Sequence, residues 1–193
     1  MAIPDFNNEG FLPPAAAFAF DDDDRPIFSG HACTLAEVEE RFVTAYPDSL
    51  TRAALFQQLR LLVKKAKLYL NCFEIVISGE FVIRRESPKS IFVVLDVQGE
   101  NIDRLDGEAQ WELDALFNGR ERRYGTDEDL TVYTGIIRAY PPDHEKFEMG
   151  NAERTVQRLM ASSPVPEAEA SGYLEVLDCE GGLANAIFNP PAP

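Results

Sequence analysis

The chain is short of the residues that most often build metal and redox sites. Its 193 residues include 2 His and 3 Cys, and the cysteines Cys33, Cys72 and Cys179 form no Cys-x-x-Cys pair. His31 and His144 lie far apart in the sequence, which disfavours a zinc site of Cys and His ligands. We expect Cys72, which lies in an apolar segment, to be a small core residue. A nucleophile pair of Cys33 and His31 stays open at this point.

Long apolar runs and positive charge are also scarce. No run approaches the roughly 20 apolar residues that cross a bilayer, and the first ten residues lack the basic and apolar regions of a signal peptide. We therefore expect a cytoplasmic protein without a membrane partner. The chain has 18 Lys and Arg against 33 Asp and Glu, a net charge of −15. This charge repels phosphate backbones, so it disfavours direct nucleic-acid binding and favours a protein partner that is basic.

Apolar residues are plentiful enough for one packed domain. They make up 45% of the chain and include 13 Phe. The spacing Thr34-x-x-Glu37 predicts a capping box and a helix over 35–46, and Ser49 can cap a helix over 50–69. Apolar periodicity predicts further helices over 107–118 and 151–161, and strands over 72–78, 91–97, 129–140 and 172–178. The fold class is α/β, with a mixed sheet of about four or five strands and helices packed on it.

Changes in composition divide the chain into three parts. Residues 1–33 form an irregular, proline-containing lead-in, and its acidic run Asp21–Asp24 is expected in an exposed loop. Residues 34–161 form the core. Residues 162–193 form a linker and a C-terminal segment that contains a short strand.

The segment 72–97 carries the main functional signal. It reads CFEIVISGEFVIRRESPKSIFVVLDV: an apolar strand runs into Gly79, a basic loop follows, and a second apolar strand begins near Ile91. This layout is typical of a nucleotidyltransferase core, in which a Gly-Ser turn holds a triphosphate and an Asp-x-Asp pair binds two metal ions. Here the turn is Gly79-Glu80, and the Asp-x-Asp slot is Ser90-Ile91-Phe92.

The segment from Gly79 to Phe92 resembles the signature G-S-F-V-T…P-x-D-I-D of an uncharacterised nucleotidyltransferase-like family. The opening Ile3-Pro4-Asp5-Phe6-Asn7, the following Leu12-Pro13-Pro14 and the helix TLAEVEERF are similar to the same family, so the resemblance covers about residues 1–140. It implies a nucleotidyltransferase-like mixed sheet flanked by helices. Active members of the wider superfamily use Mg²⁺ and an NTP, and they include tRNA-modifying toxins and AMP-transferring antitoxins.

The chain departs from the signature where the chemistry would occur. Phe92 cannot bind Mg²⁺, Ser90 is a poor substitute for a carboxylate, and the carboxylate of Glu80 would repel phosphates. We therefore expect a catalytically inactive protein that uses no cofactor and binds a macromolecular partner. The resemblance to the superfamily implies a toxin–antitoxin or defence setting. Candidate ligand-binding residues around the degenerate site are Gly79, Glu80, Arg84, Arg85, Lys89 and Asp129.

Other readings of the same residues stay open. An active nucleotidyltransferase could use a rearranged metal site built from Glu80, Asp96 or Asp129. The former nucleotide cleft could instead hold a less charged ligand beside Phe92. Segment 72–97 could also be a plain strand pair in another α/β fold.

Overall fold

The computed structural model describes residues 3–15, 17–20, 26–28, 30–117, 121–124, 130–147 and 172–179. The predicted helix 151–161, the linker 162–171, the acidic run Asp21–Asp24 and Asp129 lie outside the described residues. Within the described ranges, six strands form one mixed sheet in the order β3-β8-β4-β5-β7-β6. Their bounds are β3 His31–Cys33, β8 Leu174–Cys179, β4 Cys72–Ser78, β5 Ser90–Gln98, β7 Leu130–Ala139 and β6 Glu121–Tyr124. The α/β class with a mixed sheet is therefore confirmed.

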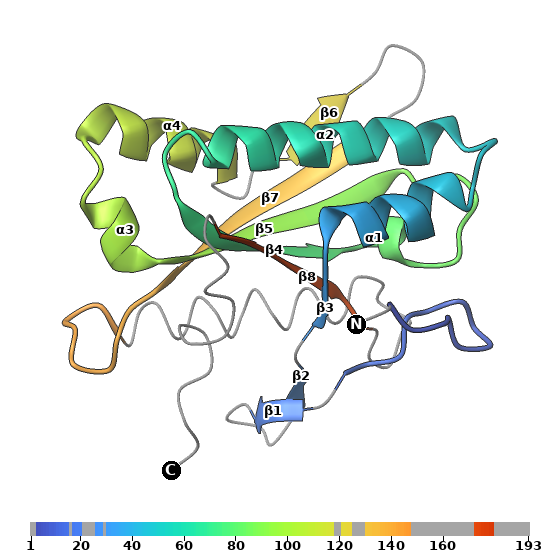
Figure 1. Cartoon of the computed structure of the whole chain (residues 1–193), viewed down its shortest axis with the longest axis horizontal. Coiled ribbons are helices and arrows are strands. Elements are labelled where there is room, and N and C mark those ends of the chain that lie inside the picture. The colour runs from blue at the N-terminus through green and yellow to red at the C-terminus, as the bar shows by residue number, and fades with distance from the viewer. Residues whose placement is uncertain are drawn as a thin grey trace.

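The centre of the sheet combines both kinds of strand pairing. Strand β4 pairs antiparallel with β5 and with β8, whereas β5 pairs parallel with β7. The parallel pair is connected through α3 (Gly99–Asp103) and α4 (Gly107–Phe117), as a parallel connection requires a crossover. Figure 1 shows α4 and α2 (Leu50–Ala66) lying over one face of the sheet. A separate ribbon of β1 (Ala17–Phe20) and β2 (Pro26–Phe28) lies on the other side.

The strands β4 and β5 are buried on both faces, which explains their nearly unbroken apolar sequences. Alternate residues such as Ile75, Ile77 and Val93 join the main core beneath the helices, and residues of the opposite parity form a second cluster. The members of that second cluster are Val76, Val94, Ile137 and Tyr173.

The helix starts follow the predicted caps. The Thr34 hydroxyl accepts a hydrogen bond from the Glu37 N–H, and the Glu37 carboxylate accepts one from the Thr34 N–H, which is the predicted capping box. Helix α1 (Leu35–Glu39) continues into a π-helical turn η1 (Glu40–Thr44), so the predicted helix 35–46 changes its winding halfway along. At α2, the Ser49 hydroxyl accepts from the Arg52 N–H.

The first 33 residues contribute more than an irregular lead-in. Strand β3 is part of the main sheet, and the N-terminal segment 3–15 is hydrogen-bonded to the loop after β4 and to the start of β8. Its Gly10 carbonyl accepts from the Arg84 N–H at 2.7 Å, and its Leu12 carbonyl accepts from the Gly172 N–H at 2.8 Å. Leu12 itself is fully buried. The segment therefore acts as a strap that joins two parts of the fold.

Among the described residues, no helix is long and apolar enough to cross a membrane. Cys72 is not the core thiol that the sequence suggests, because it is disulfide-bonded. Strand β8 places Cys179 directly opposite Cys72 in the strand register.

Candidate functional site

The turn after β4 is built around Gly79. Its φ of +86° and ψ of −164° lie in a backbone region that is essentially restricted to glycine. A Cβ at this position would also lie 2.7 Å from the ring of Phe92 on the neighbouring strand. Glycine is therefore required for two reasons: the backbone conformation disfavours other residues, and a Cβ would be too close to the Phe92 ring. The turn continues into a 3-10 helix, η2, over Glu80–Val82.

Glu80 is the first residue after the turn, and its carboxylate is used inside the loop. It accepts a hydrogen bond from the backbone N–H of Lys89 at 2.7 Å and forms an ion pair with Arg85. The Lys89 carbonyl in turn accepts from the Thr131 N–H at 2.8 Å. The carboxylate thus closes loop 80–89 and takes the donors that would otherwise be available to an anion.

One of the two positions of the expected metal-binding pair is aromatic. Ser90 and Phe92 are on β5, and the parallel register places Thr131 and Tyr133 of β7 beside them. The rings of Phe92 and Tyr133 stack with centroids 4.5 Å apart and an interplanar angle of 17°. Neither ring offers the carboxylate oxygens that Mg²⁺ prefers, so these residues do not fit a two-metal site.

The basic residues that the sequence proposed for the site do not share one environment. Arg84 is exposed and its guanidinium lies over the Phe6 ring, 5.6 Å from the centroid, so it belongs to the contact with the strap. Arg85 and Lys89 remain beside Glu80. The structure therefore brings Gly79, Glu80, Arg85 and Lys89 together, separates Arg84 from them, and does not describe Asp129.

Two carboxylates that the motif does not include face each other on the same sheet face as Phe92. Glu74 of β4 and Asp96 of β5 are register partners, and their exposed fractions are 7% and 0%. Each makes interactions with other groups, so neither is a free ligand. In the described part of the chain, no group of three or more His, Cys, Asp or Glu side chains is placed to hold a metal ion.

Ser78, the residue before the turn, has a hydroxyl with an unusual environment. The residue is 1% exposed, and its Oγ has no hydrogen-bond partner among the described residues. A buried hydroxyl without a partner costs free energy, so this position is a local weak point beside the turn.

Arg52 on α2 holds the turn region from behind, and it is absent from the sequence-based candidates. The side chain is fully buried and donates hydrogen bonds to the carbonyls of Phe81 (2.7 Å), Ile83 (2.8 Å), Phe42 (3.2 Å) and Arg85 (Nε, 3.0 Å). Its guanidinium carbon lies 4.0 Å from the centroid of the Tyr46 ring. Burial lowers the pKa of this guanidinium to about 10, with a small opposing effect from Tyr46. The sequence held one signal: Arg52 precedes Leu55 and Leu59 by three and seven residues, on the face predicted to be buried.

The pair Cys33 and His31 does not form an activated nucleophile. Burial, followed by the negative charges of Glu37 and Glu175, raises the pKa of the Cys33 thiol to about 12. A nucleophilic cysteine needs the opposite shift, because the thiolate is the reactive form. The His31 Nε2 atom lies 2.8 Å from the Pro13 carbonyl oxygen and is thereby engaged with the strap.

The fold and this site define an α/β protein with a mixed sheet and an aromatic pair beside a glycine turn. The chain belongs to DUF6932, a family of unknown function, whose model matches residues 4–155. No curated protein matches the chain, and no solved structure does. The matched range includes the strap, the turn at Gly79 and strands β4, β5 and β7, but it ends before β8.

Proposed function

We propose that this chain is a catalytically inactive, nucleotidyltransferase-like protein that acts by binding a macromolecular partner, in a toxin–antitoxin or defence setting. The stacking of Phe92 on Tyr133 carries the proposal. Phe92 occupies one of the two positions where the resemblance calls for a metal-binding carboxylate, Ser90 occupies the other, and Tyr133 of the neighbouring strand stacks on Phe92. Such a pair stabilises the sheet through packing and contributes nothing to phosphoryl or nucleotidyl transfer.

Glu80 supports the same conclusion. In an active site of this class, the turn donates hydrogen bonds to a triphosphate. Here the carboxylate of Glu80 accepts the Lys89 N–H and pairs with Arg85, so the loop already contains its own anion. A triphosphate would have to displace this carboxylate and would be repelled by it.

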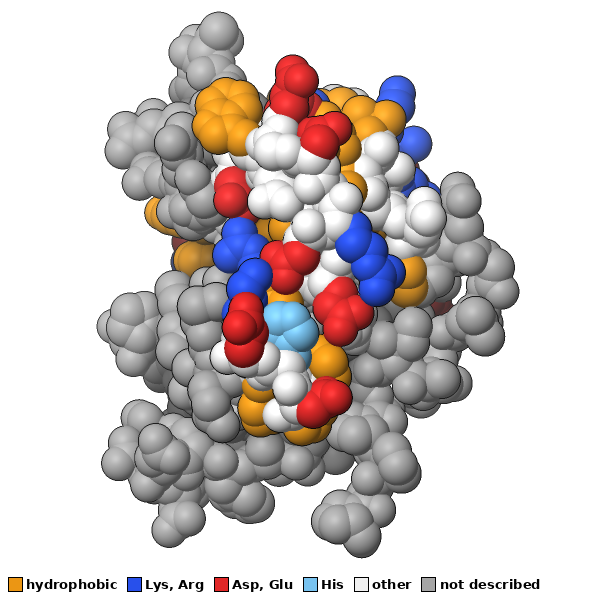
Figure 2. All heavy atoms as spheres, turned by 90° about the vertical axis from the view of Figure 1, so that its left-hand side faces the viewer, with side chains coloured by type: hydrophobic (Ala, Val, Ile, Leu, Met, Phe, Trp, Pro, Cys, Tyr) orange, Lys and Arg blue, Asp and Glu red, His pale blue; other side chains and the backbone are white. Residues whose placement is uncertain are grey.

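The charge of the chain favours a protein over a nucleic acid as the partner. The net charge is −15. On the face shown in Figure 2, acidic and basic side chains are interspersed. Ion pairs of this kind join Arg104 with Glu100, Lys146 with Asp103, and Arg138 with Asp114. Charges that are paired in this way have little effect on a distant partner, so recognition is expected to use another surface.

Calorimetric titration tests the proposal. Each of the four NTPs is titrated into the purified chain with Mg²⁺ or Mn²⁺, and we expect no binding heat at millimolar ligand. The variant Phe92→Asp with Ser90→Asp and Glu80→Ser restores the signature residues and serves as the matched comparison. Saturable, metal-dependent binding of an NTP to the unaltered chain would overturn the proposal and favour a rearranged metal site. In that case Asp96→Asn and Asp129→Ala would each be tested for loss of binding, because both belong to the alternative set.

A further inference from the structure

Large apolar side chains are exposed where α2 ends beside α4. Leu61 on α2, Leu68 just after its end and Trp111 on α4 have exposed fractions of 50%, 71% and 70%. The other strongly exposed large apolar side chain of the described residues, Leu50, lies at the far end of α2. Leu61 lies within α2, whereas Leu68 lies in the turn that follows the helix. Burying such side chains on a partner is favourable because it removes apolar surface from water.

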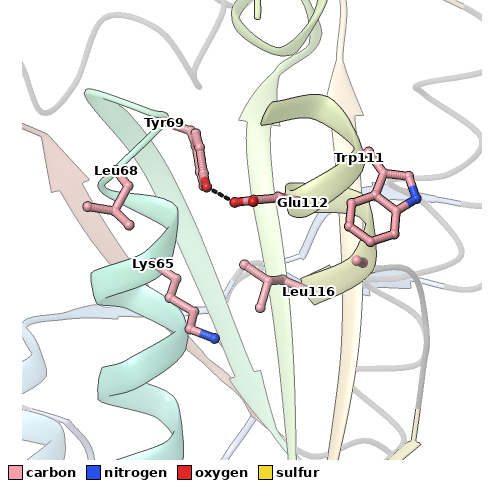
Figure 3. A pocket seen from close by; sticks show the side chains of 7 residues that line it. Lys65, Leu68, Tyr69, Trp111, Glu112 and Leu116 are labelled. Atoms are coloured by element: carbon pink, nitrogen blue, oxygen red, sulfur yellow. Dashed lines mark hydrogen bonds between the residues drawn. The ribbon is translucent and has the colours of Figure 1, made fainter. Parts of the chain in front are cut away.

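A groove runs between these two helices. Figure 3 shows Lys65, Leu68 and Tyr69 on the side of α2, and Trp111, Glu112 and Leu116 on the side of α4. The cavity has a volume of about 320 Å³, and Leu116 is buried within it. The Tyr69 hydroxyl donates a hydrogen bond to the Glu112 carboxylate across the groove, which ties its two walls together.

The wall formed by α2 has the opposite charge to the molecule as a whole. Lys65 lines the groove, Arg60 and Lys64 are exposed elsewhere on the same helix, and the sequence has no Asp or Glu from Ser49 to Phe73. At physiological ionic strength, screening limits the influence of exposed charges to about 8 Å. A segment seated in the groove therefore meets Lys65, whatever the net charge of the remaining surface.

On the other wall, the acidic lining residue already has a partner, because Glu112 accepts a hydrogen bond from the Tyr69 hydroxyl. The charge of Glu112 is therefore less available to an incoming group than that of Lys65 opposite.

We propose that this α2–α4 groove binds an acidic amphipathic helix of a partner protein. A groove between two helices accepts the apolar stripe of a third, with anchors at i, i+3 or i+4, and i+7. Leu68 and Trp111 in the groove provide the apolar contacts, and the exposed Leu61 extends them along α2. Lys65 in the groove and the neighbouring Lys64 face the Asp or Glu residues on the flank of the bound helix. The inference rests on the proposed function for the existence of a partner. It also specifies one property of the partner. The net charge of the chain favours a basic partner overall, whereas the segment that contacts the groove is acidic.

The test uses two synthetic helical peptides without tryptophan. Both have the same length and apolar spacing, and one has Glu where the other has Lys. Trp111 is the only tryptophan of the chain, so its fluorescence reports occupancy of the groove directly. We expect the Glu peptide to shift the Trp111 emission to shorter wavelength with a Kd of about 10–100 µM, and the Lys peptide to bind at least tenfold more weakly. Equal binding of the two peptides, or no shift with the Glu peptide at millimolar concentration, would overturn the proposal.

Matched variants separate the groove from general charge effects. The double variant Lys64→Glu with Lys65→Glu should weaken binding of the Glu peptide at least tenfold, and Leu68→Ser should weaken binding of both peptides. Leu50→Ser changes a strongly exposed leucine away from the groove, and Arg104→Glu reverses a charge at the C-terminal end of α3; neither should alter the affinity. Circular dichroism checks that each variant is folded. An equal loss with the control variants would show that the groove is not the binding site.

Two further measurements distinguish the possible failures. Sedimentation equilibrium shows whether the chain associates with itself. If it forms a dimer that the double variant Lys64→Glu with Lys65→Glu dissociates, the occupant of the groove is a second copy of the chain. That result would overturn the proposal that the groove binds an acidic helix of another protein. The nucleotide calorimetry is independent of the groove. Metal-dependent NTP binding together with binding of the Glu peptide would overturn the proposed function and leave the groove proposal standing. If neither NTP nor peptide binds, the proposal that the groove binds a helix is overturned and the proposed function stands.

Discussion

At the scale of single residues, the most consequential side chain is Arg52. A fully buried guanidinium is costly to desolvate, and here its hydrogen bonds to four backbone carbonyls and its contact with Tyr46 offset that cost. Those carbonyls belong to η1, η2 and the loop after η2. One side chain on α2 therefore fixes the position of the turn at Gly79.

Replacing Arg52 should destabilise the protein strongly. We expect Arg52→Ala to lower the free energy of unfolding by about 3 kcal/mol or more, since it leaves buried carbonyls without donors. Arg52→Lys should also be destabilising, because an ammonium group cannot reproduce the planar set of five donors. Urea denaturation measures both changes. Arg104→Ala, which removes an exposed arginine, should stay within about 0.5 kcal/mol of the unaltered protein. A similarly small effect at Arg52 would contradict its role as the organiser of the turn.

At the scale of elements, the junction of β4 and β5 depends on a fit between Gly79 and Phe92. We expect Gly79→Ala to cost about 2 kcal/mol or more, from the unfavourable backbone conformation together with the contact with the ring. Adding Phe92→Ala should recover the part due to the ring, so the two changes should not be additive when unfolding free energies are compared. Gly107→Ala is the control, since nothing lies within 4 Å of a Cβ at that position. Strict additivity would show that the ring does not restrict the turn.

The sequence predicted the elements with strong periodicity and missed the short ones. Strand β4 matches its prediction, and α2, α4, β5, β7 and β8 lie within about three residues of theirs. The missed elements β3, β6 and α3 have only three to five residues, which is too short for a period to be seen.

The sequence predicted the residues of the candidate site that belong to one local motif, but not the contacts between different strands. The sequence located Gly79, Glu80, Ser90 and Phe92, because the motif is local. It could not show that Tyr133 stacks on Phe92, since that contact depends on the register between β5 and β7. For the same reason, the opposition of Glu74 and Asp96 was not expected.

At the scale of the whole molecule, the sheet is completed by a strand from outside the family match. Strand β8 lies between β3 and β4, although the matched range ends at residue 155. Residues 174–179, which the sequence places in a separate C-terminal segment, thus belong to the central sheet. Without them, β3 would lose its neighbour and β4 would become an edge strand with apolar residues on both faces.

A chain that ends after residue 155 should therefore aggregate. We expect it to elute in the void volume in size-exclusion chromatography, whereas a chain that ends after Cys179 and keeps β8 should elute as the full chain does. The open edge of β4 offers unpaired N–H and C=O groups to other molecules. A soluble shorter chain with an unchanged melting temperature would show that β8 is dispensable for the fold.

The late position of β8 in the sequence also has a consequence for the nascent chain during translation. About 100 residues separate the end of β4 from the start of β8, and ribosomes add about 5–20 residues per second. For about 5–20 seconds, each nascent chain carries a finished β4 whose second neighbour has not been synthesised. One edge of β4 stays without its partner strand during that interval, and slower translation between residues 78 and 174 would lengthen the exposure.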